Sequence, residues 1–426
     1  MTINDVLKLG PRVTVAPVIN GSGDFAWEVR RLMLENDFDC IAVPLPESFR
    51  VPVEDGIQQL PSPSIAIQKE QVSFEPVGEF SESGDDDDDS PDHVSQLSYV
   101  PIDPCQPVIA AIRTAVGEHI PRAYIDLETS TFETYGQILP DAFALKKVPL
   151  HKFAAANLPM IRRPDSRQRR FRIRKMAANL RELCVDYSKV LLVCNLLDWP
   201  WIREAFLDPE LDVPQNENVE DVQLFSVENR SLYFFLGELP FVTGLYEKAR
   251  SSLDTDDYLS IDGIKSLLIT ARDRYRQDLK GRARQVTPHL LATCLKYLRN
   301  LTLMDRRFSP DLSDLVLASQ QVFGDPFALH VFDTAREYPF ASDEIGPEIR
   351  MGIEQCELPD GSICGATSRL PGIPVVWRDL QIKKKPDPDE VKKWQQKWNP
   401  YQQCSWPPED EQIESFRQTV IDRDLI

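Results

Sequence analysis

The stretch FRIRKMAANLRELCVDYSKVLLVCNLLDWPWI, residues 171–202, decides the fold class of this chain. Apolar residues from Met176 to Leu183 recur at i, i+4 and i+7, which predicts a helix that buries one stripe. Residues 190–194 are an unbroken apolar run, typical of a strand covered on both faces. Open α/β sheets place their ligand sites directly after such strands. We therefore expect any chemistry of the protein to lie near the loop that follows.

An earlier segment predicts a strand of the same sheet. Residues 12–19 and 39–43 have strand character, and residues 25–35 between them have helical spacing. This order implies a parallel crossover unit of the usual right hand. With a further strand expected at 122–127, the fold class is α/β, with a mostly parallel sheet flanked by helices.

The rest of the chain divides by composition. After residue 230 the pattern is helical, and Thr287-Pro288 and Ser309-Pro310 each combine a hydroxyl N-cap with proline at the first helical position. The last residues, 410–426, keep an amphipathic helical pattern to the end of the sequence. We predict four parts in chain order: an α/β core domain (1–50 and 99–206), an acidic disordered insertion (51–98), a helical domain (207–350), and a mixed C-terminal segment (351–426) that continues further or docks on a partner.

The insertion carries most of the net charge. Residues 51–98 hold twelve acids against the single base Lys69, so they contribute eleven of the nineteen net negative charges. Proline, serine and the run Asp85–Asp89 leave little apolar surface to bury, which favours a flexible segment. The acidity argues against a dedicated nucleic-acid binder, because phosphate contacts need clustered lysine and arginine.

Residues 162–175 are the exception, with eight basic residues and one acid. A phosphate-rich partner would suit this stretch. A solvated helix face, or a contact for the acidic insertion, is the favoured interpretation, because aromatic residues are not interleaved as in nucleic-acid grooves.

The chain has neither a transmembrane run nor a secretory signal pattern. Its eight cysteines are scattered, which indicates reduced thiols and a cytoplasmic location. Cys356, Cys364 and Cys404 lack the paired spacing of a zinc site. The turn Asn20–Asp24 could receive an anion at a helix start, but its glycines do not form a dinucleotide fingerprint, so an ordinary turn is favoured.

Polar residues end the predicted strands. Asp126 and Glu128 follow one strand, and carboxylates there could bind a metal or transfer protons. Such carboxylates are also common helix caps, and that interpretation is favoured.

The α/β part resembles the TraB/ChaN/erythromycin-esterase-like superfamily in the order of three motifs. These are residues 18–23, residues 40–47 and residues 190–202. The resemblance implies a branch with an added helical region, here marked by residues 281–284, and AAA-ATPase or von Willebrand-type subunits as partners. It also implies histidines in the first and third motifs and an acid in the second.

This sequence departs from the pattern at all three motifs. Ile19 or Asn20 stands at the first histidine position, Asp198 at the second, and the acid is displaced to Glu47. The resemblance therefore implies a remnant site at Asn20, Glu47, Asp126 and Asp198 that has lost both imidazoles.

Two functions follow as hypotheses. The first is a catalytically degenerate member that acts as a scaffold or interaction subunit of a cytoplasmic bacterial assembly, without a cofactor. The alternative is a divalent-metal-dependent hydrolase, in which Asp24, Glu47, Asp126 and Asp198 would bind Mg²⁺, Mn²⁺ or Ca²⁺. Nucleic-acid association through residues 162–175 is a weaker third hypothesis.

Overall fold

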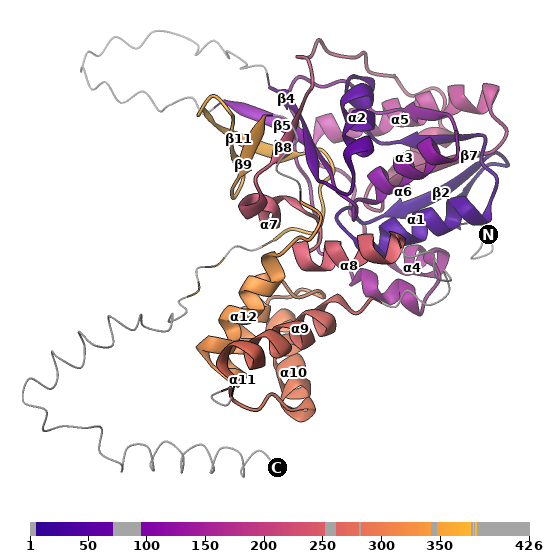
Figure 1. Ribbon diagram of the computed structural model, residues 1–426. Coiled ribbons are helices and arrows are strands. Elements are labelled where there is room, and N and C mark those ends of the chain that lie inside the picture. The colour runs from indigo at the N-terminus through magenta and orange to yellow at the C-terminus, as the bar shows by residue number, and fades with distance from the viewer. Residues whose placement is uncertain are drawn as a thin grey trace, which may run out of the picture. The chain divides into compact units, whose positions relative to one another are not determined.

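The strand predicted from its apolar run is β7 (Val190–Asn195), the central strand of a five-stranded sheet in the computed structural model (Figure 1). The strand order is β1-β2-β7-β3-β6, and every neighbouring pair is parallel except β1 and β2. The other four strands of this sheet are β1 (Lys8–Leu9), β2 (Val13–Val18), β3 (Cys40–Val43) and β6 (Arg122–Tyr124).

The structure describes residues 6–70, 95–251, 261–280, 283–341 and 347–375, together with residues 378 and 380. Four of the features discussed above lie outside these residues. They are the run Asp85–Asp89, the pair Gly281–Arg282, Cys404 and the expected helix at 410–426.

Helices cover both faces of the sheet, as the apolar run of β7 predicts. Leu191 and Val193 pack with α1 (Gly23–Glu35) and α3 (Pro107–Gly117), whereas the alternate side chains of β7 pack with α5 (Arg167–Asp186) and α6 (Trp199–Leu207). The chain crosses from β2 through β3 to β6 and then returns to β7. Because crossovers are right-handed, this reversal places α5 on the face opposite α1 and α3.

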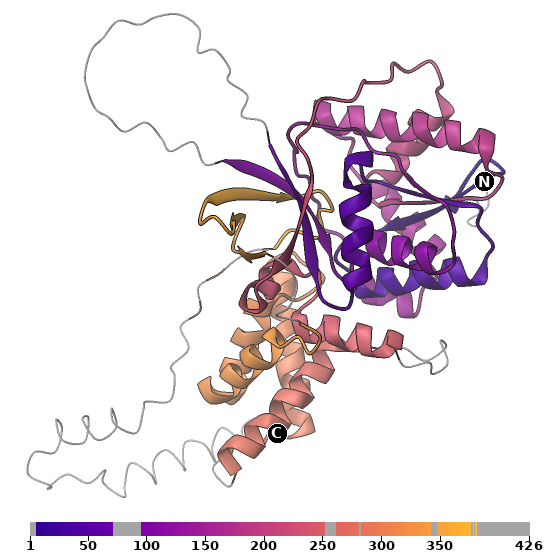
Figure 2. The same ribbon diagram turned by 45° about the horizontal axis from the view of Figure 1, so that its top comes forward.

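A second sheet closes into a barrel of order β10-β11-β5-β4-β8-β9 (Figure 2). Four of its six strand pairs are antiparallel, so the α/β class is confirmed but the expected mostly parallel sheet is only one of two sheets. Its strands are β4 (Ser64–Lys69), β5 (Gln96–Ile102), β8 (Gln223–Val227), β9 (Glu348–Met351), β10 (Gln355–Glu357) and β11 (Ile363–Ser368).

The barrel corrects the predicted extent of the acidic insertion. Residues 51–69, which we expected to be disordered, contain most of α2 (Arg50–Gln59) and all of β4, and Ile65 and Ala66 are buried. The acids at 70–92 dominate the mean composition of 51–98 and obscure this short apolar strand. The segment 207–350 is likewise not purely helical, because β8 and β9 begin or end within it.

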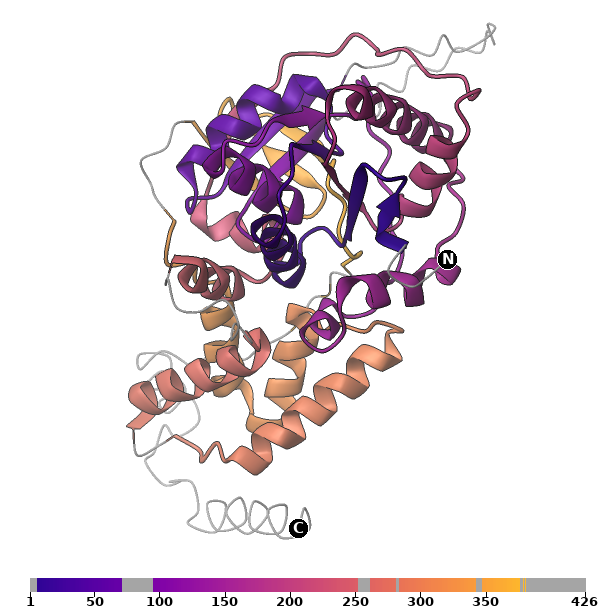
Figure 3. The same cartoon turned by 90° about the vertical axis from the view of Figure 1, so that its right-hand side faces the viewer.

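Helices follow β8, and most of them pack on one another (Figure 3). The side chain of Thr287 caps α10 as predicted, by accepting a hydrogen bond from the Leu290 N–H. The predicted cap at Ser309 is wrong, because Asp311 caps α11 instead. The remaining helices are α4 (Leu150–Asn157), α7 (Leu232–Phe235), α8 (Pro240–Ser251), α9 (Gly263–Leu279), α10 (Pro288–Met304), α11 (Leu312–Phe323) and α12 (Asp325–Arg336).

Helix α8 joins this helical part to the parallel sheet. Glu247 on α8 is buried and accepts two hydrogen bonds from Arg113 on α3, at 2.9 and 3.2 Å. Tyr246, its neighbour, donates a hydrogen bond of 2.7 Å to Asp24 on α1. Across the described part of the chain, no helix combines the length and apolarity that crossing a membrane requires.

Candidate functional site at the carboxyl edge of the parallel sheet

The carboxyl edge between β2 and β7 is the topological switch point, because α1 and α6 leave these strands toward opposite faces. Residues 369–372 of the chain itself lie there, and we call them the strap. The carbonyl oxygen of Pro371 accepts hydrogen bonds from Nδ2 of Asn20 and of Asn195, each 3.3 Å away. Gly372 bridges to Asn20, and a Cβ at Gly372 would lie 3.0 Å from the Asn20 carbonyl oxygen. The crevice is therefore filled by backbone.

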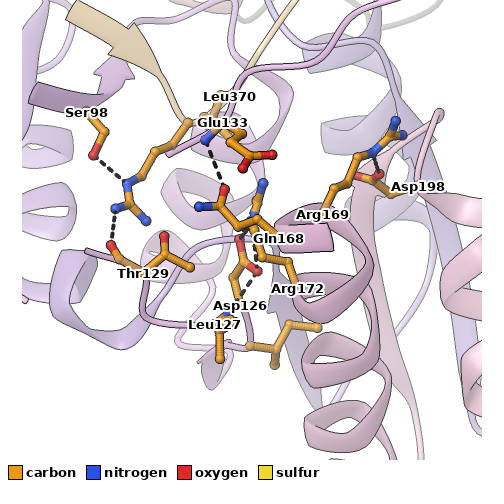
Figure 4. Close-up of polar contacts among 12 residues, drawn as sticks. Ser98, Asp126, Leu127, Thr129, Glu133, Gln168, Arg169, Arg172, Asp198 and Leu370 are labelled. Atoms are coloured by element: carbon orange, nitrogen blue, oxygen red, sulfur yellow. Dashed lines mark hydrogen bonds and ion pairs between the residues drawn. The ribbon is translucent and has the colours of Figure 1, made fainter. Parts of the chain in front are cut away.

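Beyond the end of β6, Asp126 forms a buried ion pair with Arg172 of α5 (Figure 4). The guanidinium approaches one carboxylate oxygen to 2.5 Å and 2.9 Å, and the side chains are only 1% and 3% exposed. The other oxygen accepts the Leu127 N–H at 2.8 Å. Burial opposes the charge on Arg172, but Asp126, Tyr135 and Asp198 together outweigh it, and the pKa of the guanidinium is raised. Both charges are thus compensated within the protein.

Asp198, in the loop after β7, is held by two partners. Nε of Arg169, also on α5, lies 2.7 Å from one oxygen (Figure 4). The hydroxyl of Tyr135 donates to the other oxygen at 2.5 Å. Burial and the negative charge of Asp198 raise the pKa of Tyr135 well above its ordinary value, so Tyr135 stays a hydrogen-bond donor.

A third arginine, Arg369, belongs to the strap and is buried between the rings of Phe49 and Phe132. It donates to neutral acceptors: the Ser98 hydroxyl at 2.9 Å, the Gln68 side chain at 2.7 Å and the Thr129 carbonyl at 3.0 Å. Burial, with the nearby charge of Arg172, lowers the pKa of Arg369 to about 10. This side chain ties the strap to the barrel and to the loop after β6.

No family model, curated protein or solved structure is significantly similar to this chain. Membership of the TraB/ChaN/erythromycin-esterase-like superfamily therefore stays a prediction from the three sequence motifs.

The structure brings together two of the predicted remnant-site residues, Asp126 and Asp198, and places the other two elsewhere. Asn20 lies at the strap, while Asp126 and Asp198 face adjacent arginines of α5. Glu47 lies apart, with its side chain 61% exposed and paired with Arg50. Asp24 belongs to a separate cluster with Tyr246 and Lys146.

The four carboxylates of the metal hypothesis are thus engaged by different partners. Within the residues that the structure describes, no three histidine, cysteine, aspartate or glutamate side chains are grouped so as to hold a metal ion. The glycine turn is also occupied, because the Gly23 N–H at the start of α1 donates to the Glu238 carboxylate at 3.1 Å. A protein carboxylate stands where an anion would bind.

The arginines of this site were missed by sequence reasoning, which assigned residues 162–175 to a solvated face. A signal existed for Arg172, which precedes Met176 by four residues and so falls on the buried stripe of α5. Arg369 offers no such signal, because its partners Gln68, Ser98 and Thr129 are all more than two hundred residues away in sequence.

Proposed function

We propose that this chain is a non-catalytic scaffold or interaction subunit whose inherited site has become a structural centre. The observation that carries the proposal is the closed carboxyl edge, where the backbone at Pro371 fills the switch point and Arg172 forms a buried ion pair with Asp126. A substrate that reached Asp126 would have to displace Arg172. Leaving one charge of a buried pair unpaired costs about 3–5 kcal/mol, so this carboxylate is poorly suited to meet a substrate.

The outer face of α5 is the surface that we assign to a partner. The inward arginines of α5 hold the carboxylates, whereas Arg167 and Arg170 of α5, and Arg162 in the loop before it, are exposed. Aromatic rings lie among the exposed charges: the guanidinium of Arg167 lies 5.1 Å from the Phe171 ring centroid. The cation of Arg163 lies 4.7 Å from the Trp201 ring.

This surface, which we call the α5 surface, fits an acidic face of another protein. Arginine and aromatic side chains are the types enriched at interface hot spots. A nucleic acid is disfavoured, because the whole chain carries a formal charge of −19 and would repel a polyanion at long range. AAA-ATPase or von Willebrand-type subunits are the partner class that the superfamily resemblance implies.

The experiment is affinity purification of the tagged full-length chain from its native host, followed by measurement of the mass of the complex. We expect a stoichiometric protein partner that is retained at low salt and released as salt is raised. The triple charge reversal Arg162→Glu, Arg167→Glu, Arg170→Glu should abolish its retention.

The matched control reverses three other exposed charges, Lys147→Glu, Lys152→Glu and Lys296→Glu, and should retain the partner. Recovery of a monomer without any partner would contradict the proposal. Recovery of a nucleic acid instead of a protein, if the triple variant no longer retained it, would contradict the proposed class of partner.

A further inference from the structure

A cavity of about 400 Å³ lies beside the strap, on the side of the glycine turn. Its polar lining includes Asn20 and Ser22 from the β2–α1 turn, Asp141 from the loop before α4, and Glu238 from the segment before α8. The volume falls in the range of about 300–1,000 Å³ that small-molecule sites occupy. None of these four side chains is used by the charged site around Asp126.

Two buried oxygens in the lining have no hydrogen-bond partner. Asn20 is 4% exposed, and its Oδ1 is unsatisfied because its Nδ2 is already directed at the Pro371 carbonyl. Ser22 is 5% exposed and occupies the N-cap position of α1, yet its hydroxyl makes no capping hydrogen bond. A buried polar atom without a partner costs about 1–3 kcal/mol, and a ligand that bonds to it recovers that cost.

The charged groups of the lining are mostly acidic. Asp141 and Glu238 both contribute carboxylates, and only one oxygen of Glu238 receives the Gly23 N–H. Arg307 also lines the cavity, but its charge is compensated by the ion pair with Asp311. The cavity therefore presents hydrogen-bond acceptors together with two carboxyl groups, of which Glu238, with its pKa raised to about 8, is charged only when a bound cation or a higher pH favours its ionisation.

The remaining walls are apolar or aromatic. Tyr233 and Phe234 form a tilted pair with ring centroids 3.8 Å apart, and Leu370 and Ile373 of the strap region lie in the same lining. Aromatic faces attract organic cations, and aliphatic walls accommodate a hydrocarbon chain. A hydrated metal ion would gain nothing from these walls.

We propose that this cavity binds a small organic cation through a primary ammonium or guanidinium group, which donates hydrogen bonds to Asn20, Ser22 and the two carboxylates. Such a group occurs in free amines and in lysine or arginine side chains of a peptide. The inference is independent of the proposed interaction function, because it involves different residues on a different side of the strap.

The experiment is calorimetric titration of the full-length chain with five-carbon probes that differ in charge. Cadaverine, a diamine, should bind, whereas 1,5-pentanediol and glutarate should bind at least tenfold more weakly. Agmatine as a free guanidine, and N-acetyl-lysine amide and N-acetyl-arginine amide as peptide mimics, distinguish the two sources of the group.

Two conservative variants test the acceptors. Glu238→Gln keeps an oxygen that accepts a hydrogen bond from the Gly23 N–H, and Asp141→Asn keeps one that accepts from the Phe143 N–H. The fold should therefore persist in both variants. Each should weaken cadaverine binding by about tenfold, which is 1.4 kcal/mol. The exposed changes Glu118→Gln and Asp165→Asn are the matched controls and should leave affinity unchanged.

Equal binding of cadaverine and 1,5-pentanediol would overturn the proposal, as would affinity for glutarate alone. Failure of every cationic probe to bind at millimolar concentration would overturn it as well. An unchanged cadaverine affinity in Ser22→Ala would contradict the proposed hydrogen bond between the ammonium group and the Ser22 hydroxyl.

Discussion

Asp126 and Arg172 define the charged site at the scale of single residues. The two side chains are almost fully buried and are joined by at least two hydrogen bonds. Removing one of them is therefore far more destabilising to the fold than removing both. Asp198 and Arg169 repeat the arrangement one turn earlier on α5. The role of the carboxylates at this edge is therefore to stabilise the fold.

The first prediction concerns this pair. Asp126→Leu should lower the free energy of unfolding by about 3–5 kcal/mol, because Arg172 is left buried and uncompensated. The double variant Asp126→Leu, Arg172→Met should recover most of that loss. Urea unfolding followed by tryptophan fluorescence measures both. A double variant no more stable than Asp126→Leu would show that the cost does not come from the unpaired charge.

The second prediction concerns Glu238. Burial first, and then the charges of Asp24, Asp141 and Asp103, raise the pKa of Glu238 from 4.5 to about 8. The folded state thus binds this proton more tightly than the unfolded chain, so its contribution to stability is complete below pH 4.5 and is lost as pH rises through 8. Burial also raises the pKa of Asp103 to about 6, which adds a fall in stability with rising pH over a lower pH range.

Glu238→Gln should therefore flatten the fall in melting temperature between about pH 5 and about pH 8, the interval between the pKa of Glu238 in the unfolded chain and in the folded protein, because its amide does not titrate. Differential scanning calorimetry across that range checks the effect. The exposed variant Glu118→Gln should keep the wild-type slope. An unchanged slope in Glu238→Gln would contradict the raised pKa.

At the scale of elements, backbone segments meet closely at glycines. Gly21, with φ of +73°, lies against Gly237 before α8, and a Cβ on Gly237 would come within 2.2 Å of the Gly21 Cα. This approach brings Glu238 to the N-terminus of α1. The two turns thereby join the helical part to the parallel sheet.

We predict that Gly237→Ala lowers the free energy of unfolding by on the order of 1–3 kcal/mol, because one of two backbones must move. Gly117→Ala is the matched control. Its added Cβ meets nothing within 4 Å at the end of α3, and alanine favours a helix over glycine by about 0.5–1 kcal/mol. Denaturant midpoints compare the two. Equal effects would mean that the Gly21–Gly237 contact does not constrain the fold.

The elements that the sequence predicted are those with local signals. The apolar period of α5, the unbroken run of β7 and the Thr287 cap depend on neighbours within one element. The barrel was missed because it joins strands whose paired residues are up to 269 positions apart, and no periodicity reports such pairing. The strap at Pro371 was missed for the same reason.

At the scale of the whole molecule, three remote segments converge on one sheet edge. Residues 369–372 fill the switch point, α5 supplies the arginines, and the segment before α8 caps α1. The positions of Asp126 and Asp198 at strand ends could be predicted, but their partners could not. Partner identity depends on tertiary contacts, whereas strand ends are visible in the hydrophobic pattern.

The two sides of this sheet edge differ in their chemistry. The side around Asp126 is neutralised and rigid, and the side around Ser22 retains unsatisfied acceptors beside a cavity. The cavity side depends on the strap staying in place, since Pro371 orients Asn20 and Leu370 lines the cavity. A strap that opened readily would be a lid over a working site.

Amide hydrogen exchange of the strap therefore measures directly whether the crevice stays closed. The Arg369 N–H donates to the Tyr99 carbonyl of β5 at 2.8 Å, so it reports whether the strap leaves the barrel. We predict that Arg369 and Leu370 exchange as slowly as the core strands β5 and β7, opening only with global unfolding. Exchange of the strap within seconds, while β5 and β7 stay protected, would contradict a permanently closed crevice.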